Sequence, residues 1–336
     1  MRKVAINGLG RIGRLTLRHL MTVPHVQVVA VNDLADAATL AYLMKHDSMH
    51  GQAAFPVASD GGHLVLDGRR IRVCGEAHPA AIPFADFGAE VVLECTGQFT
   101  ERAAASAHLR GPVGHVLLSA ASADADQTLV LGVNEGALDA TRHRIISCAS
   151  DTTQALAPMV KVLDEAFGLE HGFVTAVHSY TNDQRVLDLP HADLRRARAA
   201  AHSMIPTSTE AAGAIGQVLP HLAGRLDGLA VRVPTPDVSI LDLTATLRRE
   251  ISLEAVHAAF RNAASLGPLA PYLEVLDEEL VSSDLVGRAA SCLYDPFLTK
   301  LLGPRFVKVF GWYDNEFAYA ARLKDLCVHV LNRVAS

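Results

Sequence analysis

A glycine-rich loop near the start of the chain constrains its fold more than any other feature. The loop has the spacing G-x-G-x-x-G, follows an apolar segment at residues 2–7 and opens an amphipathic stretch that runs to about residue 21. A second apolar segment follows at residues 26–31, so this order predicts a strand, a tight loop, a helix and a parallel strand. Backbone N–H groups at such a helix start can face a pyrophosphate, and glycines allow its close approach. The residues expected to form this cradle are Gly8, Gly10, Arg11, Ile12 and Gly13.

An acidic residue completes this dinucleotide-binding pattern. Asp33 lies about twenty residues beyond the last glycine of the loop, just after the second apolar segment. At that place a carboxylate accepts hydrogen bonds from the adenosine ribose hydroxyls and repels a 2′-phosphate, so the pattern favours NAD over NADP. A structural role is the alternative, because aspartate is also a common N-cap of a helix that follows a strand. The two roles are compatible.

Strands and helices alternate through about residue 150, and the pattern then changes. The alternation predicts an α/β fold that begins with a Rossmann domain, a doubly wound parallel sheet, over residues 1–150. Beyond a predicted helix at residues 152–167, strands follow one another with fewer crossovers, which favours an α+β domain with a mixed or antiparallel sheet over residues 151–314. A helix over residues 315–336 is expected to complete the first domain. The other segments with strand or helix character are 89–94, 101–109, 116–119, 145–147, 172–177, 228–233 and 238–247, and residues 180–206 are expected to be irregular.

Composition narrows the classes of protein to which the chain can belong. A net charge of −6 and the lack of a long apolar run argue against nucleic acid or a membrane as the main partner. The five cysteines are scattered without a CxxC pair, and no signal peptide is recognisable, so the cytoplasm is the expected compartment. The 16 histidines are dispersed without a metal-ligand spacing, so no metal site is expected.

Six segments spread over the chain form a recognisable set of motifs. They are Asn7-Gly8-Leu9-Gly10-Arg11-Ile12-Gly13-Arg14, Ser147-Cys148-Ala149-Ser150-Asp151-Thr152-Thr153-Gln154, His178-Ser179-Tyr180-Thr181-Asn182-Asp183-Gln184, Pro206-Thr207-Ser208-Thr209-Glu210-Ala211-Ala212, Arg232-Val233-Pro234 and Trp312-Tyr313-Asp314-Asn315-Glu316. The set resembles phosphorylating glyceraldehyde-3-phosphate dehydrogenases, and erythrose-4-phosphate dehydrogenases share the same outline. The resemblance implies a Rossmann domain, a catalytic domain, NAD as cofactor and a homotetramer in which the 180–206 loop lines a subunit interface. The basic cluster Arg195, Arg196 and Arg198 in that loop could form an anion site, but a solvated or interface-paired run is the favoured interpretation.

The resemblance also implies roles for individual side chains. His178 corresponds to the base beside the family's nucleophile, and Asn315 to the residue that holds the nicotinamide carboxamide. Arg232, with Thr181 and Asp183, corresponds to the site for the substrate's own phosphate. Structural alternatives stay open: a histidine after a strand is often structural, Arg232 could form an ion pair at the domain interface, and Asn315 could cap the last helix. Further residues implied are Thr96 and Ser119 for the cofactor, and Ser150, Thr152, Thr209 and Glu210 for the substrate.

The sequence departs from the family pattern at the reaction centre. Asp151 stands where the family has its nucleophilic cysteine, and Glu210 stands where a glycine lines the inorganic-phosphate site. A carboxylate is a far weaker nucleophile toward a carbonyl than a thiolate, and two carboxylates would repel an attacking phosphate. Beside His178, Asp151 is expected to favour the protonated imidazole and to raise its pKa. The other departures are Cys148, Gln154, Ala155, Gly213, Ala318 and Ala320.

These features favour one reaction class and leave three alternatives. The leading hypothesis is direct, non-covalent hydride transfer between NAD and a small phosphorylated or similarly anionic carbonyl or alcohol. Asp151 and His178 would act as a dyad like that of hydroxyacid dehydrogenases. The alternatives are oxidation of an aldehyde hydrate to the free acid with Asp151 as general base, a non-catalytic NAD-binding homologue with a regulatory role, and ordinary family activity through a displaced nucleophile. Cys148 is the candidate for that nucleophile, but its place on the strand side of the turn favours a core role.

Overall fold

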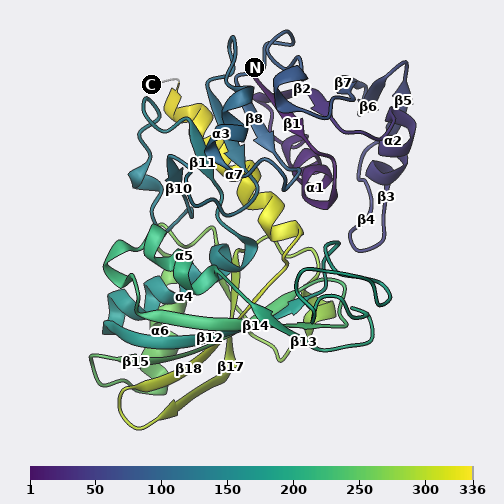
Figure 1. Cartoon of the computed structure of the whole chain (residues 1–336). Helices are drawn as coiled ribbons and strands as arrows, with labels where there is room; N and C mark the ends of the chain where they lie inside the picture. The colour runs from purple at the N-terminus through teal and green to yellow at the C-terminus, as the bar shows by residue number, and fades with distance from the viewer. Residues whose placement is uncertain (335–336) are drawn as a thin grey trace. The chain divides into compact units, whose positions relative to one another are not determined.

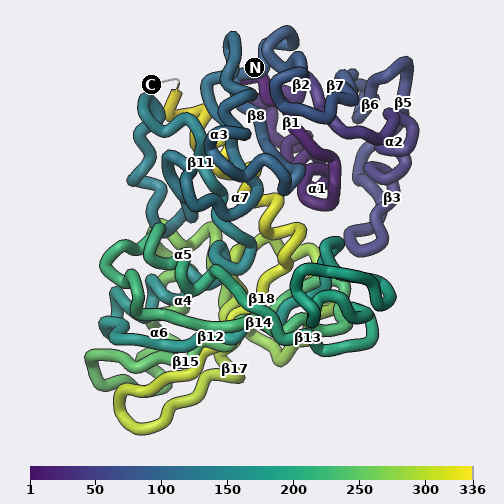
Figure 2. The backbone as a smooth tube through the Cα atoms, viewed as in Figure 1, coloured from purple at the N-terminus to yellow at the C-terminus, as the bar shows by residue number. Residues whose placement is uncertain are grey.

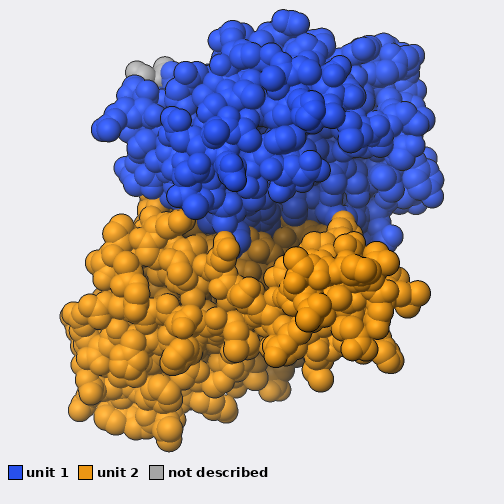
Figure 3. All heavy atoms as spheres, in the orientation of Figure 1, with its two compact units in different colours: residues 1–129, 136–150, 319–336 blue, residues 130–135, 151–318 orange. Residues whose placement is uncertain are grey.

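The computed structural model describes residues 1–334, and these form two compact units (Figures 1 and 3). Unit 1 consists of residues 1–129 and 136–150 and of the chain from Tyr319 onward, and unit 2 consists of residues 130–135 and 151–318. One division falls after residue 150. Residues 130–135 and 315–318 belong to unit 2, although the sequence patterning assigned them to the first domain. Residues 335–336 of the expected last helix lie outside the described residues.

A nine-stranded sheet forms the centre of unit 1. Its strands are β1 (Arg2–Asn7), β2 (Val26–Asn32), β5 (Val57–Asp60), β6 (His63–Leu66), β7 (Arg69–Cys74), β8 (Val91–Glu94), β9 (His115–Leu118), β10 (Gln127–Thr128) and β11 (Ile145–Ser147). Their order is β10-β11-β9-β8-β1-β2-β7-β6-β5, and the strands from β10 to β7 pair in parallel. The predicted doubly wound parallel sheet is thus confirmed. The strand β7 and the antiparallel extension by β6 and β5 were missed. β5 is largely exposed, and β6 has only four residues, although its Leu64 and Leu66 are fully buried.

Helices cover this sheet. They are α1 (Arg11–Leu20), α2 (Ala37–Lys45), the short α3 (Arg102–Ala105) and the part of α7 (Phe317–Val334) that lies in unit 1, and β3 (His46–Asp47) pairs with β4 (Gly51–Gln52) as a separate ribbon. Val4, Ala5 and Ile6 of β1 are fully buried, a continuous apolar run that is typical of a parallel strand covered on both faces. Arg2 donates from Nη1 to the carbonyl oxygen of Leu331 (2.8 Å), so the last helix is tied to the first strand. In Figure 2 the last helix, α7, is drawn in yellow.

A seven-stranded mixed sheet organises unit 2, as the sequence predicted. Its strands are β12 (Leu169–Ser179), β13 (Ile205–Ser208), β14 (Leu226–Val233), β15 (Ser239–Leu247), β16 (Leu273–Val275), β17 (Cys292–Leu302) and β18 (Phe306–Tyr313). Their order is β13-β14-β12-β15-β18-β17-β16, with β12–β14 and β16–β17 parallel and the other neighbours antiparallel. The helices of this unit are α4 (Asp151–Phe167), α5 (Ala211–Val218) and α6 (Leu253–Ser265).

The two faces of this sheet differ in burial. Leu241, Leu243 and Ala245 alternate along β15 and are fully buried, which is the period-two pattern of a strand with one covered face. On the other face, Phe173 of β12 is 68% exposed and Leu229 of β14 is 47% exposed. The sheet therefore buries one apolar face within unit 2 and leaves aromatic and aliphatic side chains on the other.

The segment between β12 and β13 contains no named helix or strand, as the sequence predicted. Two arginines of its basic cluster are in ion pairs: Arg196 lies 3.2 Å from a carboxylate oxygen of Asp183, and Arg198 lies 2.9 Å from one of Asp188. The acids that pair with Arg196 and Arg198 belong to the same loop, and pairing of this run across a subunit interface stays a prediction. Within residues 1–334, no helix is both long enough and apolar enough to cross a bilayer.

Candidate active site

The glycine loop of unit 1 has the backbone geometry that a dinucleotide cradle needs. Gly8 has a φ of +90°, and a Cβ on it would lie 2.9 Å from backbone atoms of Cys95 and Thr96. A Cβ on Gly13 would lie 2.0 Å from the carbonyl oxygen of Gly8, so α1 starts in direct contact with the loop. Gly10, the N-cap of α1, has no side chain with which to cap the helix, and a Cβ on it would meet nothing within 4 Å. The N–H groups of the first turn and the open space beside Gly10 fit the pyrophosphate of NAD.

Asp33 ties this loop to the end of β2. Its Oδ2 accepts a hydrogen bond from the backbone N–H of Leu9 (2.8 Å), and its Oδ1 accepts one from Ala35 (3.0 Å). The alternative that Asp33 caps the next helix is wrong, because Asp36 caps α2 by accepting from the N–H of Thr39. The Asp33 side chain is half-buried, and each carboxylate oxygen keeps acceptor capacity. Its contact with a ribose stays a prediction.

Arg11 is engaged in an ion pair with Asp47. Burial alone would raise the pKa of Asp47, but hydrogen bonds from Arg11 and from the backbone N–H groups of His50 and Met49 outweigh it and hold that pKa at about 2. The guanidinium of Arg11 is therefore balanced inside unit 1. Arg11 and the half-buried Ile12 would therefore contact a cofactor through their backbone groups in the first helical turn.

Thr96 and Ser119 follow the carboxyl ends of β8 and β9, where open α/β sheets bind their ligands. Thr96 donates from its backbone N–H to the carboxylate of Glu94 (2.9 Å), and the N–H of Ser119 donates to the carbonyl oxygen of Glu94 (2.9 Å). Glu94 is buried and also accepts from the amide of Asn7 (2.6 Å), while His108 Nε2 lies 3.0 Å from the same oxygen. A buried polar network thus fixes both predicted cofactor residues at this edge of the sheet.

A strained turn leads from β11 to α4. Ala149 is buried and has a φ of +55°, a conformation that costs on the order of 1–2 kcal/mol for a residue with a Cβ. Tyr319 donates its hydroxyl to the carbonyl oxygen of Ala149 (2.8 Å), and Ser147 Oγ accepts from the Ala149 N–H (3.0 Å). Ser150 is half-buried in this turn, and Asp151 is the first residue of α4. The hydrogen bonds hold the strained backbone in place and so fix where the helix begins.

Asp151 and His178 form a close pair in unit 2. Nε2 of His178 lies 3.1 Å from Oδ2 of Asp151, and Oδ1 of Asp151 accepts from the backbone N–H of Thr152 (2.7 Å). Burial acts to raise the pKa of Asp151, but the charge and hydrogen bond of His178 together with hydrogen bonds from Thr152 outweigh it, so that pKa lies below its ordinary value. Burial likewise acts to lower the pKa of His178, but Asp151 and the hydrogen bond to the carbonyl oxygen of Ser179 outweigh it, so the pKa of His178 is raised. The direction expected from the sequence is found.

Arg232 lies beside this pair. It is the register partner of His178 across the parallel strands β12 and β14, so the two side chains leave the same face of the sheet. Its Nη1 donates to Asp183 Oδ1 (2.8 Å), to Thr181 Oγ1 (2.9 Å) and to Gln184 Oε1 (3.0 Å). The alternative of a domain-interface ion pair is wrong, because Arg232 and its acidic partner both belong to unit 2. Gln184 was missed as a member of this cluster, although it lies in the same motif segment.

Asn315 is held by two serines. Its Oδ1 accepts hydrogen bonds from Ser179 Oγ (2.8 Å) and Ser239 Oγ (2.9 Å), so the amide is oriented with its N–H₂ group on the other side. The alternative that Asn315 caps the last helix is wrong, because Asp314 accepts from the N–H of Phe317 (2.6 Å) at that helix start. Ser179 and Ser239 were missed. Ser239 has no sequence signal, since only the pairing of β12 with β15 brings it near.

The remaining predicted residues lie at or near helix starts. Thr209 Oγ1 accepts from the N–H of Ala211 (3.2 Å) at the beginning of α5. Glu210 is the N-cap of α5, but its exposed side chain makes no capping hydrogen bond. Thr152 Oγ1 lies 3.0 Å from the hydroxyl of Tyr313. Cys148 is buried, which agrees with its expected core role.

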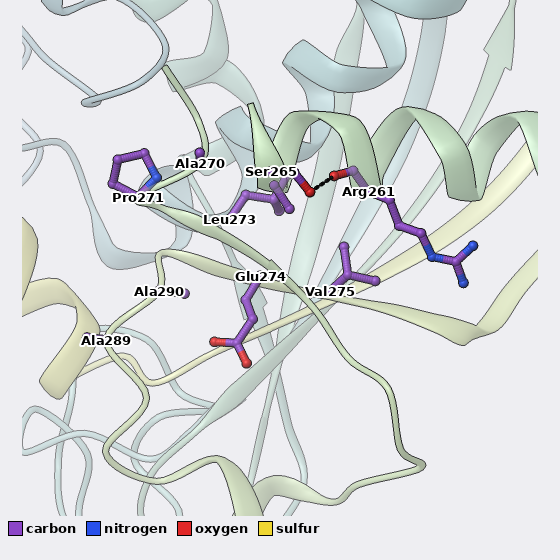
Figure 4. A pocket seen from close by; sticks show the side chains of 10 residues that line it. Arg261, Ser265, Ala270, Pro271, Leu273, Glu274, Val275, Ala289 and Ala290 are labelled. Carbon is purple, nitrogen blue, oxygen red and sulfur yellow. Dashed lines mark hydrogen bonds between the residues drawn. The ribbon is translucent and has the colours of Figure 1, made fainter. Parts of the chain in front are cut away.

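A separate hollow of about 580 Å³ lies elsewhere in unit 2, between α6, β16 and residues 289–290 (Figure 4). Its charged lining residues are Arg261 and Glu274, and Glu274 is paired with Arg288 at 2.7 Å. None of the predicted site residues lines this hollow.

Comparisons with known proteins agree with the motifs. Residues 2–102 match the family described as glyceraldehyde 3-phosphate dehydrogenase, NAD binding domain, and residues 147–315 match the corresponding C-terminal domain. The chain is 49% identical to glyceraldehyde-3-phosphate dehydrogenase 1 of Bacillus cereus over 333 residues, which is 99% of each chain. It is 48% identical to glyceraldehyde-3-phosphate dehydrogenases of Streptomyces coelicolor (99% of each chain) and Geobacillus stearothermophilus (98% of each chain).

The two matched domains divide the chain in the same way as its motifs: an NAD-binding domain comes first, and the domain that carries Asp151, His178 and Arg232 follows. The chain therefore belongs to the glyceraldehyde-3-phosphate dehydrogenase family, an NAD-dependent family of oxidoreductases.

Proposed function

We propose that this protein is an oxidoreductase that uses NAD for direct, non-covalent hydride transfer on a small phosphorylated or similarly anionic carbonyl or alcohol. The observation that carries the proposal is the Asp151–His178 pair, which places an acid–base group beside Arg232 in the domain expected to bind substrate. In this arrangement His178 can supply a proton, and Arg232 beside it can bind an anionic group of the substrate. It does not supply a thiolate.

The contacts of Asp151 argue against a covalent intermediate. One carboxylate oxygen accepts from the N–H of Thr152 and the other faces His178, so both oxygens are engaged. The pKa of Asp151 is lowered, chiefly by His178 against the opposing effect of burial, and a weakly basic carboxylate is a poor nucleophile. Cys148 lies buried before the strained turn at Ala149, so its thiol is not presented at the start of α4. We infer that the family's cysteine chemistry is absent.

The spacing of Arg232 and His178 limits the size of the substrate. Neighbouring strands lie about 4.8 Å apart, and these two residues are register partners, so an anion held by Arg232 has its reacting carbon only a few bonds away. Arg232 and Thr181 would hold a phosphate or carboxylate by charge-assisted and neutral hydrogen bonds. In this structure the guanidinium of Arg232 donates to the carboxylate of Asp183, which a bound anion would have to replace.

The glycine loop would hold the pyrophosphate of NAD, Asp33 the ribose, and Asn315 the carboxamide through the N–H₂ group that Ser179 and Ser239 orient. When bound, NAD supplies or accepts a hydride. Two alternative functions remain. The same NAD-binding residues would serve a homologue that only senses NAD. Oxidation of an aldehyde hydrate to the acid would need Asp151 as a general base. The lowered pKa of Asp151 disfavours that last reaction.

The proposal predicts turnover that does not depend on inorganic phosphate. Purified protein with NADH or NAD would be offered phosphorylated trioses and tetroses, with and without phosphate, while absorbance of the reduced cofactor is followed. We expect equal rates in both conditions, because no acyl intermediate awaits phosphate. The phosphate dependence of the natural chain would be compared with that of the double variant Asp151→Cys, Glu210→Gly. This variant introduces the thiol of the family pattern and removes the exposed carboxylate at α5. A strict phosphate requirement in the natural chain would contradict the proposal, and NAD binding without any turnover would favour the sensor.

We also propose that the chain forms a homotetramer in the cytoplasm, as its family resemblance implies. The exposed face of the unit 2 sheet supports self-association: Phe173 and Leu229 lie on it, and Phe306 of β18 is register-aligned with the same face and is 39% exposed. Apolar side chains clustered on one sheet face are typical of a protein interface. Sedimentation velocity is expected to give the mass of four chains. A monomer at micromolar concentration would contradict this proposal.

A further inference from the structure

Both ring nitrogens of His178 face oxygen acceptors. Nδ1 lies 2.6 Å from the carbonyl oxygen of Ser179, and Nε2 lies 3.1 Å from Oδ2 of Asp151. A carbonyl oxygen can only accept, so Nδ1 carries a proton. In a neutral imidazole, Nε2 would then present a lone pair to a carboxylate oxygen. A second proton must therefore sit between Nε2 and Asp151, on one side or the other.

The surroundings of Asp151 assign that proton to the histidine. Oδ1 of Asp151 accepts from the backbone N–H of Thr152 (2.7 Å) and lies 3.3 Å from the Thr152 hydroxyl. Asp151 is also the first residue of the 17-residue helix α4, where the helix dipole favours negative charge. Hydrogen bonds to a carboxylate and a positive helix end both stabilise its ionised form.

The other groups that face His178 do not reverse this assignment. Arg232 on β14 opposes a charged imidazole, but the guanidinium is itself paired with Asp183 (2.8 Å). Tyr313 on β18 meets the ring edge-on, with 6.3 Å between ring centroids, and burial raises the pKa of its phenol, so it stays neutral. Asp151, within hydrogen-bond distance of Nε2, therefore stabilises the imidazolium.

We infer that His178 rests as an imidazolium in an ion pair with Asp151, and that the site is therefore arranged to reduce a carbonyl rather than to oxidise an alcohol. The direction of reaction rests on the function proposed above, whereas the charge state of His178 does not. Reduction of a carbonyl to an alcohol consumes one hydride and one proton. The cofactor in its reduced form would supply the hydride and leave oxidised.

The proton comes from the dyad. Nε2–H of His178 leaves Asp151 Oδ2, its acceptor in the resting site, and gives its proton to the carbonyl oxygen. The π electron pair of the carbonyl becomes the new O–H bond, the hydride forms the new C–H bond at the carbonyl carbon, and the ring is left neutral. Because Nε2 then faces the Asp151 carboxylate with a lone pair, the ring regains a proton from solvent, to which its side chain is 12% exposed. The reverse reaction needs a neutral His178 at the outset. That state is disfavoured at neutral pH, so oxidation should require alkaline conditions.

The charge state can be measured without substrate or cofactor. Two-dimensional ¹⁵N NMR of histidine-labelled protein distinguishes an imidazolium from either neutral tautomer. Because the chain has 16 histidines, the signal of His178 would be assigned by its loss in His178→Gln. We expect the imidazolium pattern at neutral pH and a titration midpoint above the ordinary value of about 6.5. A neutral tautomer at neutral pH would overturn the inference.

Two variants separate the dyad from general effects of charge. Asp151→Asn should bring the midpoint of His178 down to or below its ordinary value, because burial then acts on the ring without its counter-ion. Asp188→Asn is the matched control: Asp188 is exposed, pairs with Arg198 and should leave the midpoint unchanged. Retention of the raised midpoint in Asp151→Asn would overturn the assignment of Asp151 as the stabilising group.

Kinetics then test the direction. In the natural chain, kcat/KM for reduction should be flat through neutral pH and fall above the NMR midpoint, while kcat/KM for oxidation should rise with the same midpoint. An imidazolium without turnover in either direction would support the charge state and refute the proposed function. Turnover with a neutral His178 would support that function and overturn this inference.

Discussion

Replacing Asp151 by asparagine is expected to lower kcat/KM for carbonyl reduction by roughly 10²–10⁴-fold, the range that a positioned acid–base group contributes. The amide keeps the size of the side chain but has no charge, so it no longer stabilises the imidazolium of His178, which Asp151 contacts at 3.1 Å. Steady-state kinetics measure the loss. Calorimetry should show nearly unchanged NAD affinity, because the glycine loop belongs to unit 1 and Asp151 to unit 2.

The control for this variant is Asp188→Asn, which makes the same chemical change at an exposed ion pair of unit 2. Exposed ion pairs contribute little to stability, so this variant should fold and react like the natural chain. Wild-type rates in Asp151→Asn would contradict the dyad. A parallel loss of NAD affinity in Asp151→Asn would instead indicate a general structural defect.

Replacing Arg232 by alanine is expected to raise KM for a phosphorylated substrate by roughly 10- to 150-fold, because a hydrogen bond to a charged group contributes about 1.5–3 kcal/mol. The same substitution should change KM for the unphosphorylated analogue far less, since that analogue offers no anion to bind. The comparison of the two substrates is the measurement. It separates loss of anion binding from loss of structure, because a structural defect would affect both substrates alike.

Arg198→Ala is the matched control for the arginine, since Arg198 is 65% exposed and pairs with Asp188 of the same loop. It should leave both KM values unchanged. Arg232→Lys should recover part of the affinity, because lysine keeps the charge but loses the planar geometry of the guanidinium. An equal effect of Arg232→Ala on both substrates would rule out Arg232 as the anion anchor.

Short-range patterns predicted the elements better than their contacts. The glycine spacing predicted the loop, and the apolar run of β1 predicted a buried parallel strand. Asp33 and Asn315 show the limit: each was a plausible helix cap, but Asp36 and Asp314 accept the capping hydrogen bonds instead. In both places two polar residues close together in sequence could cap the helix, and the residue at which the helix begins decides which of them does so.

Short strands were also difficult to predict. β5 is largely exposed and carries little apolar signal, and β6 alternates buried leucines over only four residues, which is too short a stretch to indicate a strand reliably. The serines that orient Asn315 were missed for a different reason. Ser179 and Ser239 are 60 residues apart and meet through the antiparallel pairing of β12 with β15.

The sequence by itself determined the class of fold, the cradle for a dinucleotide and the presence of Asp151, His178 and Arg232, because these follow from local spacing and from motifs along the chain. Only the tertiary structure decided that Asp151 and His178 touch, that Arg232 stands beside His178, and that both nitrogens of the imidazole meet acceptors. These relations depend on strand register and on the strained turn before α4, which bring together groups that are far apart in sequence. The protonation state of His178 therefore depends on the contacts of its two ring nitrogens, which the sequence alone does not give.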